Sequence, residues 1–178
     1  MTGPHRTRPA PPTPRHRRGA PRATTRFTEL FGVPLPRGLR DEAATLSWAQ
    51  FLDRYDDSRR TRGPLRLRQW IPGGAAGPAA STYRATLSVG ERHTTVAAVA
   101  TGPIGALTAM LHDAGVAVEV LGFHQMSSAA GRTATVIRGS DGARATWAMA
   151  RDADPGASAR AAVIACANRL LTPAPTGA

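Results

Sequence analysis

The side chains that could perform catalysis are few in this chain and are poorly spaced for it. His124, Ser127 and Asp113 are the residue types of a Ser-His-Asp hydrolase, in which the histidine takes the proton of the serine hydroxyl and the acid orients the histidine. Asp113 falls at the end of an expected helix, and nothing in the spacing brings it to His124. A histidine at a strand end is more often exposed or hydrogen-bonded than catalytic. We therefore expect no triad and no catalytic residue.

A metal centre is not expected either. His93, His112 and His124 lack the spacing of metal ligands, and no acidic cluster accompanies them. The single cysteine, Cys166, excludes a disulfide framework and a cysteine-based zinc site. It lies in an alanine-rich helical pattern that predicts an inert, buried thiol. The sequence thus predicts no metal and no cofactor.

Length and composition limit the architecture that can position any site. The chain has 178 residues, enough for one ordinary domain, and 42% of them are hydrophobic. Only 5% are aromatic, so Ala, Val and Leu must build the core, and 18 Gly with 15 Pro exclude an uninterrupted helical bundle. No stretch approaches 18 consecutive apolar residues, so we expect no membrane span. These features, with one cysteine and no secretory signal, favour a cytoplasmic bacterial protein.

The positive charge is concentrated at the N-terminus. The chain has a net charge of +11 and no lysine, and residues 1–26 contain seven arginines, six prolines and no acid. Such a segment cannot bury apolar surface, so we expect a disordered tail. It could act as a nucleic-acid or membrane-surface arm, but it lacks aromatic rings to stack on bases. A solvated tail is the interpretation we favour, and residues 172–178 are expected to form a second, short tail.

The region from residue 65 onward contains an internal repeat. Apolar and polar residues alternate over residues 82–89, which predicts a half-buried strand. A turn, a second strand over residues 93–100, and a helix opened by Gly102 and Pro103 follow. A shift of 52 residues superposes matching positions, namely Gly90 on Gly142, Arg92 on Arg144, Thr94 on Thr146, Pro103 on Pro155 and Leu111 on Val163. With first strands at 65–70 and 116–123, the order is βββα twice.

A helical segment is expected before this repeat, over residues 27–64. Ser47 and Gln50 have the spacing of a capping box, and Trp48, Phe51 and Tyr55 lie on one face of the helix that follows. The predicted fold is therefore α+β, with this short helical linker followed by two βββα units over residues 65–171. We expect the units to pack around a pseudo-twofold axis, with a ligand site at their junction and sheet edges available for dimer formation.

Several stretches, taken in order, resemble the C-terminal leucine-sensing domain of 2-isopropylmalate synthase, which is also the dimerisation domain of that enzyme. They are Thr-Gly-Pro-Ile at 101–104, Val-Leu-Gly-Phe-His-Gln at 120–125, Gly-Arg-Thr-Ala at 131–134, Thr-Trp at 146–147 and the segment 158–169 ending in Ala-Asn-Arg. The resemblance covers about residues 30–171. The domain of that family consists of two βββα units, which agrees with the repeat.

The resemblance implies an effector site between the two units, with the ligand carboxylate at the start of the first helix. Carried over position by position, the effector-binding residues are Gly102, Pro103, Ile104, Val120, Phe123, Ser127, Ala134 and Val136. Some family residues differ here. Gly122 replaces an acid, Phe123 a tyrosine and Gln125 a glutamate, so the implied pocket is smaller and less polar.

The resemblance also implies a regulatory role rather than catalysis. The catalytic barrel of that family needs roughly 200 residues or more, so this chain is too short to contain it. We expect a module that is not an enzyme on its own. It would bind leucine or a similar small branched-chain molecule, form a homodimer and act on a separate catalytic subunit. The alternatives are a degenerate scaffold that dimerises without a ligand, and a nucleic-acid-binding protein that uses the arginine-rich tail and the basic connector at 59–68.

Overall fold

The computed structural model describes residues 20–58 and 63–172. Three helices come first: α1 (Ala23–Phe31), α2 (Arg37–Glu42) and α3 (Trp48–Tyr55). The first repeat unit follows as β1 (Leu65–Ala75), β2 (Ser81–Val89), β3 (Arg92–Ala100) and α4 (Pro103–Asp113). The second unit is β4 (Glu119–Ser127), β5 (Thr133–Ser140), β6 (Ala145–Asp152) and α5 (Pro155–Leu171). The predicted α+β class and the βββα order are therefore confirmed.

Each unit forms its own three-stranded antiparallel sheet, with the strand orders β1-β2-β3 and β4-β5-β6. The repeated positions take equivalent roles. Gly90 (φ 59°) and Gly142 (φ 92°) adopt left-handed backbone in the two matching turns, which favours glycine. Pro103 and Pro155 each begin the helix of their unit, where proline needs no amide hydrogen bond. The 52-residue repeat in the sequence thus corresponds to a repeat in the structure.

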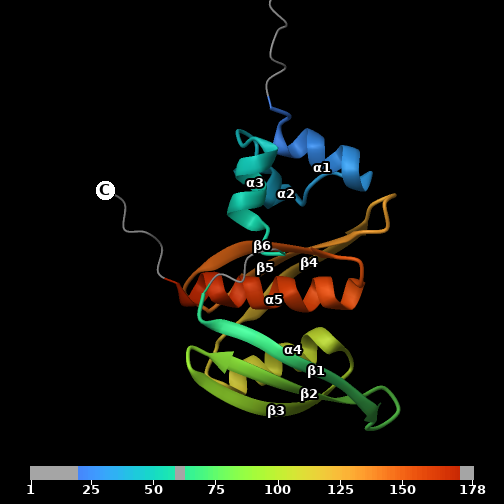
Figure 1. Cartoon of the computed structure of the whole chain (residues 1–178), viewed down its shortest axis with the longest axis vertical. Coiled ribbons are helices and arrows are strands. Elements are labelled where there is room, and N and C mark those ends of the chain that lie inside the picture. Colours follow the sequence, from blue (N-terminus) through green and yellow to red (C-terminus); the bar gives the residue numbers. More distant parts are fainter. Residues whose placement is uncertain (1–19, 59–62, 173–178) are drawn as a thin grey trace, which may run out of the picture.

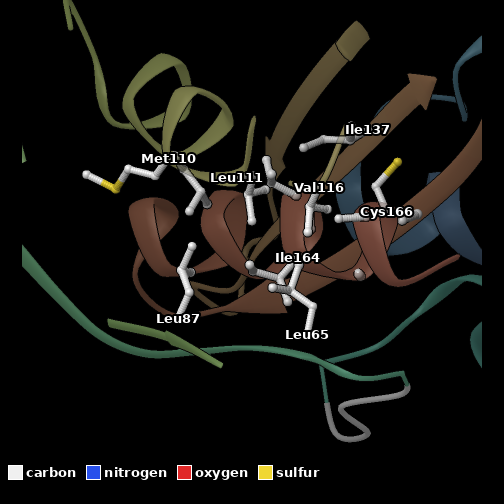
Figure 2. Packing of buried hydrophobic residues seen from close by; sticks show 14 of the residues in the cluster. Leu65, Leu87, Met110, Leu111, Val116, Ile137, Ile164 and Cys166 are labelled. Atoms are coloured by element: carbon white, nitrogen blue, oxygen red, sulfur yellow. The ribbon is translucent and has the colours of Figure 1, made fainter. Parts of the chain in front are cut away.

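Helix α5 lies between the two sheets and joins them into one core (Figure 1). Its alanine-rich face contacts β5 and β6, while its other side meets α4 and β1. Figure 2 shows Leu65 and Leu87 from the first sheet approaching this helix, with Leu111 of α4 and Ile137 of β5 completing the cluster. Small side chains let the backbones of helix and sheet come close, so the shortage of aromatic residues is compensated by close packing.

The N-terminal helices cover the opposite face of the second sheet, away from α5. Phe27, Phe51 and Tyr55 are buried there against β5 and β6. The capping box is confirmed, because the Ser47 hydroxyl accepts from the Gln50 amide while the Gln50 side chain accepts from the Ser47 amide. The first sheet has no such cover among the described residues, and Val99 is 61% exposed on its outer surface.

Some sequence predictions differ from the structure. The predicted boundary of the tail at residue 26 is too far along the chain, because α1 begins at Ala23, which is fully buried. The many arginines near Ala23 in the sequence predicted a disordered segment, although Ala23 packs in an apolar cluster. Strand β4 begins at Glu119 rather than at Val116, which is a buried residue of the preceding loop. Several segments lie outside the described residues, namely residues 1–19 of the tail, Arg59, Arg60 and Arg62 of the basic connector, and residues 173–178.

The second cluster contains one titratable group with a strongly shifted pKa. Burial first, and then a hydrogen bond that its hydroxyl donates to Glu42 at 2.8 Å, raise the pKa of Tyr55 to about 12. The unfolded phenol ionises near pH 10, so this stabilising contribution is complete below pH 10 and is lost as the pH rises toward 12. The chain should therefore lose more unfolding free energy between pH 9 and pH 11 than Tyr55→Phe does, measured by urea unfolding. Equal losses in the two proteins would refute the assignment.

Within the residues that the structure describes, no helix is long and apolar enough to cross a membrane.

Candidate functional site

The cross-strand register decides which of the expected effector residues share a surface. Phe123 pairs with Ile137, and Ser127 pairs with Thr133, whose backbone oxygen is bonded to α5. Because cross-strand partners point to the same face of a sheet, Phe123 and Ser127 lie on the α5 side. Val120 also packs against the core that contains α5, since a bulge between Val120 and Gly122 shifts the alternation. These three residues lie along one surface of the edge strand β4.

Ala134 and Val136 do not belong to that surface. They pair with Met126 and His124, so they lie on the opposite face of the sheet. Both are fully buried beneath the N-terminal helices. The prediction that Ala134 and Val136 line one pocket with Phe123 is therefore wrong. Aligning motifs does not reveal the register of a hairpin. Here the register directs Ala134 and Val136 into the core beneath the N-terminal helices.

The other expected residues form the start of α4. Gly102 is the N-cap residue and Pro103 is the first residue of the helix. The N-cap makes no side-chain hydrogen bond, and a Cβ added at Gly102 would meet nothing within 4 Å. The amide groups of this first turn therefore have no side-chain cap, and the helix dipole favours a negative charge at this end. Ile104, in the same turn, is half-buried against the main core.

The edge of β4 carries exposed apolar side chains. Leu121 is 49% exposed and Phe123 is 44% exposed, and both lie on β4, one of the two edge strands of the second sheet. We call Val120, Leu121, Phe123 and Ser127 the β4 edge surface. An edge strand has unpaired backbone groups as well as these side chains, and such edges are natural places for a second chain to add.

Polar side chains outside the expected effector set attach β4 and β5 to α5. The Gln125 amide donates to Thr135 Oγ1 and to the carbonyl of Pro155, both at 2.9 Å. The Ser158 hydroxyl, fully buried, lies 2.8 Å from Thr135 Oγ1 and 3.0 Å from the carbonyl oxygen of Ala150. This network satisfies buried polar groups, as it must, and fixes the start of α5 on the sheet. The one sequence signal of this network is Gln125, which stands where the resembled family has a glutamate.

The structure also separates the residues of the hydrolase-like combination. His124 and Ser127 lie on opposite faces of β4, because they are three residues apart in a strand. The His124 ring lies tilted beside Trp147, with 6.4 Å between ring centroids, and Ser127 is hydrogen-bonded to Thr133. Burial raises the pKa of Cys166 to about 11, so this thiol is protonated at neutral pH and is a poor nucleophile. The described residues contain no group of His, Cys, Asp or Glu that could hold a metal.

A hollow lined by described residues lies away from the β4 edge surface. It is a groove of about 480 Å³ between β1 of the first unit and α5 of the second. A ligand site at the junction of the units was expected, but none of the eight expected effector residues lines this groove.

No protein-family model matches the chain, and no curated protein matches it at a significant level. The functional inference therefore depends on the geometry above and on the resemblance of the motifs.

Proposed function

We propose that the chain is a regulatory module of the 2-isopropylmalate synthase type. It binds leucine or a similar small branched-chain amino acid, forms a homodimer and transmits the ligand state to a separate catalytic subunit. The observation that carries the proposal is the pair of βββα units built around one core. The sequence resemblance predicts this arrangement, including the turn at 101–104. The two units are related by a pseudo-twofold axis in this proposal.

In this proposal the effector surface is formed by two groups of expected residues, Gly102, Pro103 and Ile104 at the start of α4 and Val120, Phe123 and Ser127 on the α5 side of β4. The amides at Gly102 and Ile104 receive the carboxylate, because a helix start supplies free donors and a favourable dipole. Val120 and Phe123 contact the branched side chain, and Ser127 adds a hydroxyl. Ala134 and Val136 support the strand from the other face and do not touch the ligand.

Dimer formation completes this site. A small ligand on an open strand edge would keep much of its surface in water, whereas binding sites enclose most of it. A second copy that covers the β4 edge surface would bury Leu121 and Phe123 and close over the ligand. Ligand binding and self-association would then be thermodynamically linked, so each would strengthen the other. Such linkage is how the module would signal to a catalytic subunit.

Calorimetric titration of the full chain with leucine tests the proposal, with valine, isoleucine and 2-oxoisovalerate as comparisons. We expect saturable binding of leucine that Phe123→Ala weakens at least tenfold. Phe123 is exposed, so its removal should leave the fold intact. The matched control is Val99→Ala, which removes an exposed apolar side chain from a strand of the other sheet. A folded dimer that gives no heat with any ligand would instead be a scaffold without an effector.

A further inference from the structure

The groove between β1 and α5 has a strongly basic lining. Four arginines face two aspartates around it: Arg66, Arg68, Arg151 and Arg160 against Asp57 and Asp152. Its volume of about 480 Å³ is within the range of small-molecule sites. It opens at the contact between the two units, since β1 belongs to the first unit and α5 to the second.

Two of these six charges are already neutralised by partners. Arg151 binds Asp56 through two nitrogens, the Nε contact being 2.8 Å, and Asp57 pairs with Arg169 at 3.2 Å. These pairs attach the start of the α3–β1 connection to the second unit. They leave the groove with the guanidinium groups of Arg66, Arg68 and Arg160.

Arg66 and Arg68 donate hydrogen bonds to neutral groups, and Arg160 forms a solvent-exposed ion pair. Arg66 donates to the carbonyl oxygen of Gly63 at 2.8 Å, and Arg68 donates to the Ser88 hydroxyl at 3.2 Å. Arg160 lies 3.9 Å from Asp154, but that carboxylate is 64% exposed and is therefore largely screened by water. Three cations thus converge on one hollow, with Asp152 as the acid that faces them. Such a site favours a ligand with more than one negative charge.

An aromatic ring holds one of the cations in place. The Arg160 guanidinium lies 5.4 Å from the centroid of the Trp70 ring, which packs in turn on Tyr83. A guanidinium stacked on an aromatic face keeps its N–H edge directed outward, ready for two parallel bonds to a carboxylate or a phosphate. This arrangement preorganises Arg160, which lowers the entropy lost on binding.

The floor and the strand edge supply the rest of a binding site. Leu67, Ile164 and Ala165 provide an apolar surface. The backbone N–H and C=O of Leu65 form hydrogen bonds with the Asn168 side chain on the edge of β1 that faces away from β2. Backbone groups two residues apart in a strand point to the same edge, so the N–H of Leu67 also points there. A ligand here would therefore meet cations, a backbone donor and an apolar wall together.

We infer that this groove binds a small organic anion with at least two negative charges, carried by carboxylate or phosphate groups, and an apolar or planar body. It shares no residue with the effector surface at α4 and β4. An anion here would contact both units at once and would stabilise the relative position that they have in the structure.

The test is calorimetric titration of the full chain with citrate, adenosine 5′-monophosphate and inorganic phosphate, each at matched ionic strength. We expect saturable binding of at least one organic anion. Stronger binding of citrate would identify a carboxylate site, and stronger binding of the nucleotide a phosphate site. Arg160→Gln and Arg68→Gln should each weaken it at least tenfold, and Arg160→Lys should fall between them and the parent. Arg84→Gln is the matched control, because Arg84 is exposed on β2 outside the groove.

The inference is overturned if no probe saturates, or if the groove variants bind as tightly as Arg84→Gln. The second result would assign the binding to the other arginines of this basic chain. Thermal melting establishes that each variant is folded. Leucine binding should be unchanged in Arg160→Gln, so this inference and the proposed function can fail separately.

Discussion

Asn168→Ala should lower the free energy of unfolding by about 2–4 kcal/mol, because it leaves two buried backbone groups without a partner. The Asn168 carboxamide accepts from the Leu65 amide at 2.8 Å and donates to the Leu65 carbonyl at 2.9 Å. It is 3% exposed, and Leu65 is fully buried. The side chain thus acts as a strand partner for the edge of β1 and attaches the first unit to α5. Urea unfolding measures the loss.

Asn168→Asp separates the two halves of this interaction. An aspartate can still accept from the Leu65 amide, but it has no donor for the carbonyl and places a charge beside it. We expect it to be destabilised as well, since a buried acceptor remains unpaired. An alanine variant within 0.5 kcal/mol of the parent would contradict the role given to this residue, whatever the aspartate variant does.

Gly139→Ala should destabilise the chain by about 1–3 kcal/mol through overpacking. A Cβ added at Gly139 would lie 2.5 Å from the Cys166 sulfur and 3.2 Å from the Glu119 carbonyl oxygen. Cys166 is fully buried on α5, so moving its sulfur aside would disturb the packing of the helix on the sheet. The absence of a side chain at Gly139 is therefore what lets α5 approach β5.

A double variant tests the cause of this effect. Gly139→Ala with Cys166→Ala should recover part of the stability, because the sulfur is gone while the Glu119 oxygen remains. The coupling free energy from the four proteins should therefore be favourable to the double variant. Strictly additive losses would show that the sulfur contact is not the source of the destabilisation.

Local sequence patterns predict most of the secondary structure here. Gly90 and Gly142, which have left-handed backbone, form the turns of two hairpins. A proline begins each of the helices α4 and α5. These are short-range signals, since each depends on the conformation of one or two residues. The alternation over β2 and the capping box at Ser47 are of the same kind. Such features identify elements whatever the rest of the chain does.

The site was harder to predict because it depends on register and on distant packing. A sequence can show that β4 and β5 form a hairpin, but the pairing of Met126 with Ala134 follows from the loop between them. A shift of one residue would have reversed the faces. Likewise Ala23 is buried only because α1 docks on the second sheet. The basic groove joins Arg68 and Arg160, which are far apart in the chain and share no motif.

The proposed effector surface is tested most directly by an amide chemical-shift titration of the isotope-labelled chain with leucine. We expect saturable shifts at Gly102, at Ile104 and along β4, with little change in the groove between β1 and α5. We also expect the rotational correlation time to rise with leucine, as the dimer is stabilised. Saturable shifts confined to the groove, or none anywhere in a folded protein, would contradict the proposed effector surface.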